Sequence, residues 1–124
     1  MQDVLVKEIN KQIQEEVYSA YLYLSMSAYA KEQGLDGFAN WFMVQFKEEM
    51  DHAMGFFTYL LDRNEKVELL EIAKPVKDFG GIEKLFTEAL KHEQHVTRRI
   101  HLLHQLAKEH QDSAFESFIK WYID

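Results

Sequence analysis

The chain contains one proline and five glycines in 124 residues, so little interrupts its backbone. Between these interruptions, apolar residues recur three and four positions apart, which is the spacing of one face of an α-helix. This pattern predicts four helices, at about residues 3–32, 37–63, 81–110 and 113–124. The expected fold is an all-α four-helix bundle, formed by a single domain over residues 1–124.

Local sequence indicates where these helices begin and end. Gly34 follows the first helix, and glycine readily adopts the left-handed conformation found after many helices. Asp36 is expected to cap the second helix, and the spacing of Ser113 and Glu116 predicts a capping box for the fourth. The segment at about residues 64–80 is too long for a tight turn, so we expect a crossover between opposite ends of the bundle.

The overall charge favours cations as partners. The chain has 21 acidic and 14 basic residues, a formal net charge of -7, which argues against a nucleic-acid-binding surface. There is no cysteine, so a metal would have to bind through oxygen and nitrogen atoms. The first residues lack the layout of a signal peptide and no apolar run is long enough for a membrane span, so we expect a soluble, cytoplasmic protein.

Each of the three long helices has a carboxylate near the middle of its predicted buried face: Glu16, Glu49 and Glu93. His52 follows Glu49 by three positions and therefore shares its face. Burying an ionised carboxylate without a partner costs roughly several kcal/mol, so these carboxylates need a group that compensates their charge. A bound metal would do so, and oxygen-rich ligands with one imidazole suit iron or manganese and also accept zinc.

Taken singly, these residues have simpler interpretations. Glu16 and Glu49 each have an acidic neighbour and could face solvent, and His52 could be a hydrogen-bonded core histidine. Tyr23 lies two helical turns beyond Glu16, so it is either a core aromatic or a hydrogen-bond partner of a ligand carboxylate. Four histidines of the third helix are expected at solvent or interface positions: His92, His95, His101 and His104.

Four segments in the same order resemble the non-haem bacterial ferritins: EEVYSAYLYLSMSAYA, GFANWFMVQFKEEMDHAM, ALKHEQHVT and SFIKWYID. The resemblance extends over essentially the whole chain. It implies a ferritin-like four-helix bundle with a long crossover between the second and third helices. It also implies iron storage and detoxification, with oxidation of Fe(II) to Fe(III) by dioxygen or peroxide at a buried di-iron centre, in a shell of many subunits.

The resemblance also implies a role for each site residue. Glu16 and His52 correspond to ligands of the first iron, Glu49 to the bridge between the two irons, and Glu93 to a ligand of the second. Tyr23 corresponds to a residue beside the centre that donates a hydrogen bond and could donate an electron. Glu48 corresponds to a ligand of a third, more peripheral iron.

The fourth predicted helix differs from the ferritin pattern. It spans only about 18 Å, against about 45 Å for the first helix, at 1.5 Å per residue. Ferritins continue this helix, supply further iron ligands from it and add a fifth helix. We therefore expect that Asp124 is not the natural C-terminus. The alternative is a truncated form, whose second iron site and shell would be incomplete.

Met50 follows the predicted bridging glutamate, where the haem-binding bacterioferritins carry a haem ligand. Met50 also belongs to a second apolar line along the second helix, so we expect it to pack at a subunit interface without haem. A helix that is apolar on two sides predicts a homo-oligomer, at least a dimer.

The sequence thus favours a ferroxidase whose partners are Fe(II) and an oxidant. Two alternatives remain: a structural or scaffold bundle whose site holds zinc or nothing, and a rubrerythrin-like peroxidase. The peroxidase is less favoured because its usual rubredoxin module requires cysteine, which the chain lacks.

Overall fold

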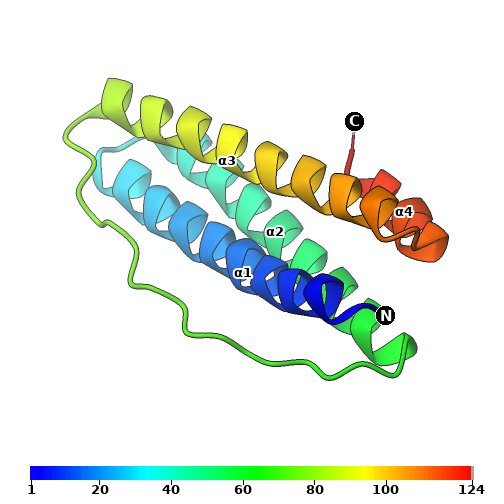
Figure 1. The fold of residues 1–124 in the computed structure, drawn as a ribbon. Helices are drawn as coiled ribbons and strands as arrows, with labels where there is room; N and C mark the ends of the chain where they lie inside the picture. The colour runs from blue at the N-terminus through cyan, green and yellow to red at the C-terminus, as the bar shows by residue number, and fades with distance from the viewer. Residues whose placement is uncertain (124) are drawn as a thin grey trace.

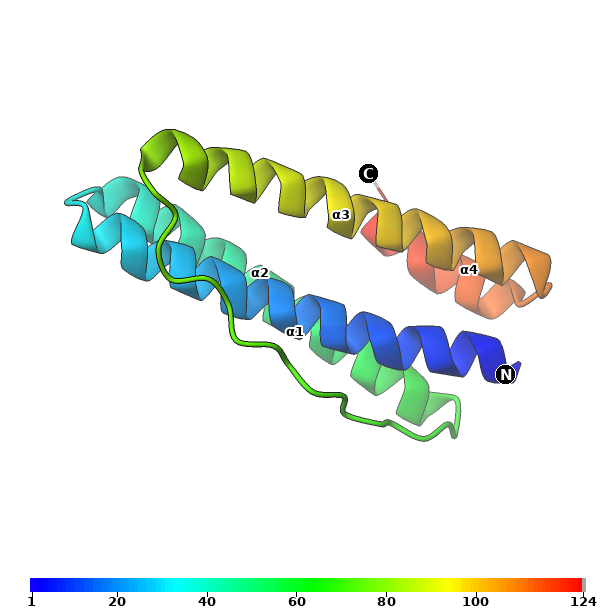
Figure 2. The same cartoon turned by 60° about the vertical axis from the view of Figure 1, so that its left-hand side comes forward.

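The computed structural model describes residues 1–123. This part of the chain is helical without strands, as the sequence predicts, and comprises α1 (Asp3–Glu32), α2 (Asp36–Asp62), α3 (Ile82–Glu109), α4 (Ser113–Ile119) and a short 3₁₀ turn, η1 (Lys120–Tyr122). The helices α1 and α2 form an antiparallel pair, α3 runs in the direction of α2, and α4 folds back along the end of α3 (Figures 1 and 2). None of the described helices is both long enough and apolar enough to cross a membrane.

The connection from α2 to α3 is a crossover that runs the length of the bundle beside α1 (Figure 1). Polar side chains of α1 hold its backbone in place. The buried Asn10 side chain donates to the carbonyl of Lys66 at 3.1 Å and accepts the backbone N–H of Glu68 at 2.8 Å. Further along, Gln14 donates to the carbonyl of Glu71 at 2.6 Å. These bonds satisfy backbone groups that no regular secondary structure pairs.

The core consists of two apolar clusters with a polar layer between them. One cluster lies toward α4 and contains Leu5, Ile9, Ile13, Phe56, Leu60, Ile100, Leu103, Ala107, Phe115 and Ile119. The other lies toward the opposite end of the bundle and contains Leu22, Tyr23, Met26, Tyr29, Ala30, Ala39, Phe42, Phe79, Leu85 and Ala89. The buried polar residues between them include Gln12, Glu16, Ser19, Glu49, His92 and Arg99. Buried polar groups need partners, so this layer is where a functional site is expected.

The predicted helix ends are partly correct. Gly34 follows Gln33, the C-cap of α1, and has a φ of 75°, as the sequence predicts. The prediction that Asp36 caps α2 is wrong, because Asp36 is the first helical residue and its carboxylate accepts a hydrogen bond from Lys31 at 2.9 Å. The capping box of Ser113 is also wrong. The N-cap of α4 is Asp112, whose side chain accepts the N–H of Phe115 at 3.0 Å.

The fourth helix is shorter than the predicted range of 113–124. It ends at Ile119, tightens into η1, and Asp124 lies outside the described residues. The tighter turn places the Tyr122 ring against Phe56, with ring centroids 4.6 Å apart. Figures 1 and 2 show that α4 lies along only one end of α3. The rest of α3 therefore has no described fourth helix beside it.

Candidate metal centre

The predicted ligands Glu16, Glu49 and His52 lie together in the polar layer. Glu16 comes from α1, and the other two lie one turn apart on the neighbouring helix α2. The Nδ1 atom of His52 is 3.6 Å from Oε2 of Glu16 and 3.6 Å from Oε2 of Glu49. One ligand atom from each residue lies within 4.8 Å of the others. Within residues 1–123, this is the only trio of potential ligands that is so closely grouped.

The two carboxylates have buried oxygens without partners. Glu16 is 1% exposed and Glu49 is 8% exposed, yet Oε2 of each accepts no hydrogen bond. Leaving such an atom without a partner costs about 1–3 kcal/mol, and more when the group is charged. Both oxygens lie beside Nδ1 of His52. The donor set, two carboxylate oxygens and one imidazole nitrogen, fits iron, manganese or zinc.

The charges of the three groups depend on one another. Burial alone would raise the pKa of Glu16, but its contacts with His52, Glu49 and Gln12 leave that pKa below its ordinary value. Burial raises the pKa of Glu49 to about 7 despite the contact with His52. Contacts with both carboxylates raise the pKa of His52 to about 10. Without a metal, a protonated His52 thus supplies part of the positive charge that the carboxylates need.

Tyr23 belongs to the apolar cluster that borders this layer, with 2% of its surface exposed. Its ring stacks on that of Phe42, with ring centroids 6.2 Å apart, and is edge-to-face with that of His92, with ring centroids 5.8 Å apart. Burial raises the pKa of its hydroxyl, and the charges of Glu93, Glu49 and Glu16 raise it further. The phenol is therefore held in its protonated form and can donate a hydrogen bond.

The remaining predicted ligands do not join this group. The sequence predicts that Glu93 lies on a buried face, and this prediction is wrong: Glu93 is exposed in the described part of the chain. The described α4 ends at Ile119 and does not cover this part of α3. Its charge nevertheless acts on the Tyr23 hydroxyl. Glu48 is exposed on α2, and Met50 is partly buried there.

A small cavity borders the trio on the side of α3 and η1. It has a volume of about 240 Å³, and its walls include Glu16, His52, His101 and Tyr122. The Tyr122 ring lies edge-on to the imidazole of His52, with centroids 5.2 Å apart. Burial and then the charge of Glu16 raise the pKa of Tyr122 to about 12. The cavity therefore leaves space beside two of the three candidate ligands, Glu16 and His52.

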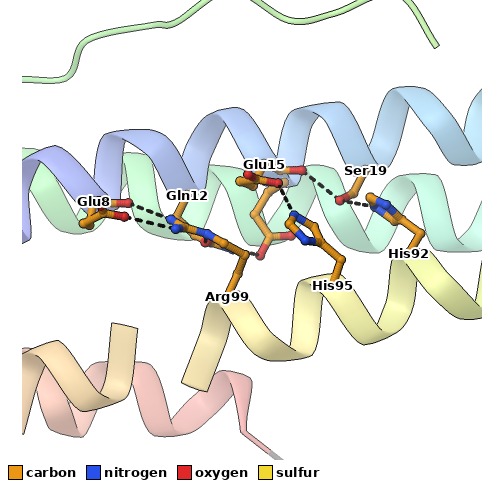
Figure 3. A network of polar contacts seen from close by, with 8 residues as sticks. Glu8, Gln12, Glu15, Ser19, His92, His95 and Arg99 are labelled. Atoms are coloured by element: carbon orange, nitrogen blue, oxygen red, sulfur yellow. Dashed lines mark hydrogen bonds and ion pairs between the residues drawn. The ribbon is translucent and has the colours of Figure 1, made fainter. Parts of the chain in front are cut away.

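A second set of polar contacts joins α1 to α3, and the sequence did not predict it (Figure 3). The expectation that His92 lies at a solvent or interface position is wrong, because this residue is 9% exposed and its Nε2 is 2.6 Å from the Ser19 hydroxyl. His95 Nε2 lies 2.8 Å from Glu15 Oε2. The four-residue spacing of Glu15 and Ser19 along α1 could have indicated a polar stripe. Their partners on α3, however, can be identified only from the tertiary structure.

Comparison with known proteins identifies the family of this chain. Residues 6–124 match the ferritin-like domain family. The chain is 36% identical over 120 residues to a bacterial non-heme ferritin of Staphylococcus aureus, covering 97% of the chain and 72% of that protein. A ferritin of Staphylococcus haemolyticus shows the same identity and coverage.

Solved structures show the same fold. An open pore ferritin from the archaeon Archaeoglobus fulgidus superposes with a TM-score of 0.96 at 39% identity, over 99% of this chain and 76% of that chain. A humanized archaeal ferritin gives a TM-score of 0.96 at 40% identity, over 99% of this chain and 74% of that chain. The chain therefore belongs to the ferritin-like family.

Proposed function

We propose that this protein binds Fe(II) as its substrate at Glu16, Glu49 and His52, oxidises it to Fe(III), and thereby serves iron storage and detoxification. The observation that carries the proposal is the pair of buried, unpartnered Oε2 atoms of Glu16 and Glu49 beside Nδ1 of His52. The relatives named ferritin support iron as the metal.

The ligand chemistry favours the oxidised product. Anionic oxygen ligands stabilise Fe(III) more than Fe(II), so the carboxylates of Glu16 and Glu49 make iron easier to oxidise. Two Fe(II) ions give up one electron each, and dioxygen with two protons becomes hydrogen peroxide. If peroxide is the oxidant, it takes two electrons and two protons to become two water molecules. The net charge of -7 would help to attract Fe(II).

The proposal gives further roles to four residues on the basis of the resemblance. Glu49 would bridge to a second iron, and Glu93, whose charge reaches Tyr23, would be a ligand of that iron. Tyr23 would donate a hydrogen bond beside the centre. Glu48, which is exposed, would contribute to a third, peripheral iron site.

The proposal also includes assembly and location. Exposed apolar side chains on α2, among them Trp41, Val44 and Met54, support contacts with other copies of the chain. A homo-oligomer, and a shell of many subunits such as ferritins form, is the expected assembly. We also propose a cytoplasmic location.

Oxidation of Fe(II) by metal-free protein tests the proposal. Aerobic absorbance kinetics should show rapid Fe(III) formation that Glu49→Ala and His52→Ala abolish. Asp51→Asn is the matched control, because Asp51 lies between these two residues on α2 but is exposed. If the unmodified chain oxidises iron no faster than the two alanine variants, the ferroxidase proposal is wrong. Tight binding of zinc without iron oxidation would favour a structural bundle instead.

A further inference from the structure

A chain of three polar side chains leads from α3 to the candidate metal centre. Arg99 of α3 donates from Nε to Oε1 of Gln12 at 3.1 Å, and Gln12 donates from Nε2 to Oε1 of Glu16 at 3.0 Å. Arg99 also donates from Nη1 to Oε2 of Glu8 at 3.0 Å (Figure 3). The residues Glu8, Gln12 and Glu16 are spaced by four, so they occupy successive turns on one side of α1.

The contact with Arg99 determines which way the Gln12 amide points. An arginine side chain has only donors, so Gln12 must turn its carbonyl oxygen toward Arg99. The amide nitrogen then faces Glu16, which as a carboxylate needs a donor. Without Arg99, the opposite orientation would become accessible, and it would place the amide oxygen against the oxygen of Glu16. The arginine therefore selects the one orientation that stabilises the carboxylate.

This arrangement separates the two oxygens of Glu16. Oε1 accepts the hydrogen bond from Gln12, whereas Oε2 has no hydrogen-bond partner and lies 3.6 Å from His52 Nδ1. We propose that Arg99 is a positioning residue for the metal centre, which acts by fixing the Gln12 amide so that Glu16 presents Oε2 to the metal. This inference rests on the proposed function of Glu16 as an iron ligand.

The burial of Gln12 and Arg99 indicates that their contact does more than join α1 to α3. Gln12 is fully buried and Arg99 is 7% exposed. An arginine that formed an ion pair only with Glu8 could remain at the surface, where most arginines lie. The Glu8 side chain is 22% exposed and balances the charge of Arg99. A pairing that served only to join α1 and α3 would need the contact with Glu8 but not the one with Gln12.

A first experiment examines the amide in the metal-free protein. The side-chain NH₂ resonances of Gln12 are followed by ¹⁵N NMR in the unmodified chain, Arg99→Met, Arg99→Lys and Glu8→Gln. Loss of the fixed orientation should move or broaden the resonances in Arg99→Met, and Arg99→Lys should partly restore them because the lysine ammonium can still donate to the Gln12 carbonyl oxygen. Glu8→Gln weakens the ion pair but leaves the contact with Gln12, so it should retain the original resonances. Unchanged resonances in a folded Arg99→Met would overturn the inference, whether or not the site binds iron.

A second experiment measures affinity with Co(II), which absorbs visible light and is not oxidised under these conditions. Both Arg99→Met and Gln12→Leu should weaken binding about tenfold, the lower end of the usual effect of a residue that orients a ligand. The double variant should lose no more than either single variant, because Arg99 acts through Gln12. Glu8→Gln should bind as the unmodified chain does, and thermal unfolding of all variants separates stability from affinity.

The two possible failures are distinguishable. If Co(II) binding to the unmodified chain is insensitive to Glu16→Ala, the proposed function of Glu16 fails, and the amide resonances still decide whether Arg99 orients Gln12. If Glu16→Ala abolishes binding but Arg99→Met leaves it unchanged or tighter, the positioning role fails and the proposed function stands.

Discussion

The Nδ1 atom of His52 on α2 lies 3.6 Å from Oε2 of Glu16 on α1, although the two residues are 36 positions apart in sequence. The imidazole faces a carboxylate oxygen that has no hydrogen-bond partner. This pair therefore joins α1 to α2 at a point where the apolar core is interrupted. Its energetic consequences can be tested independently of any enzymatic assay.

Replacing Glu49 by glutamine should stabilise the metal-free protein. Glu49 is 8% exposed, its Oε2 has no partner, and burial raises its pKa, so its ionised form is disfavoured in the fold. A neutral amide of similar shape removes this cost, with an expected gain of about 1 kcal/mol in the free energy of unfolding. Thermal unfolding at pH 8 without metal measures the effect.

Asp51→Asn is the control for that substitution, because it neutralises an exposed carboxylate on the same helix and should leave the melting temperature nearly unchanged. The same Glu49→Gln protein should lose metal binding. A lower melting temperature for metal-free Glu49→Gln would show that the ionised carboxylate is well accommodated without a metal.

The junction before α4 should make stability depend on pH. Asp112 accepts two hydrogen bonds from Arg63, at 3.2 and 3.1 Å, and one from the Phe115 N–H. Burial would raise the pKa of Asp112, but these contacts lower it below its ordinary value. The stabilisation is therefore present above the unfolded pKa of about 3.9 and is lost as the pH falls through the lower folded value.

Asp112→Asn provides the comparison, because asparagine also caps helices but cannot form the ion pair with Arg63. Urea unfolding of both proteins should show the unmodified chain to be more stable at pH 6, by about 1 kcal/mol. That advantage should shrink toward pH 3. An advantage that is the same at both pH values would mean that the ion pair contributes nothing measurable.

Gly55 should tolerate alanine only when Tyr122 loses its hydroxyl. Replacing a glycine inside a helix by alanine usually stabilises it by about 1 kcal/mol. At Gly55, however, the new methyl group would lie closer to the Tyr122 hydroxyl oxygen than real Cβ atoms approach. We therefore expect Gly55→Ala to lower the melting temperature in the unmodified chain and to raise it in the Tyr122→Phe background. Equal effects in the two backgrounds would contradict the described packing of η1 on α2.

Asn10 should control the mobility of the crossover. Its side chain pairs with the carbonyl of Lys66 and the N–H of Glu68, so Asn10→Ala leaves both groups without their partner. Hydrogen exchange at the Glu68 amide should accelerate by about tenfold, corresponding to about 1.4 kcal/mol of local stability. Gln14→Ala, which removes the bond to the Glu71 carbonyl, is the control and should leave exchange at Glu68 unchanged.

Much of the fold can be predicted from the sequence because it depends on local periodicity. The range of α1 follows from its apolar spacing, and the end of that helix follows from Gly34, whose φ of 75° suits glycine. The cap of α4 could not be identified this way. Both Asp112 and Ser113 are good capping residues, and the ion pair of Asp112 with Arg63 is a tertiary contact.

In the candidate site too, local periodicity predicts some features and tertiary contacts determine the others. Glu16, Glu49 and His52 could be identified because each lies on the predicted buried face of its helix, near mid-length. Whether Glu93 is buried depends on the neighbouring helix, so periodicity along α3 could not determine its exposure. Likewise, nothing in the local sequence shows that Arg99 contacts Gln12, because the contact joins residues 87 positions apart.

The most direct test of the account is to locate the iron. Crystals of metal-free protein are soaked anaerobically in Fe(II), and anomalous diffraction is measured on both sides of the iron absorption edge. The account predicts an iron peak within coordination distance of Oε2 of Glu16, Oε2 of Glu49 and Nδ1 of His52. Iron found only at surface carboxylates or histidines, with this trio empty, would contradict it.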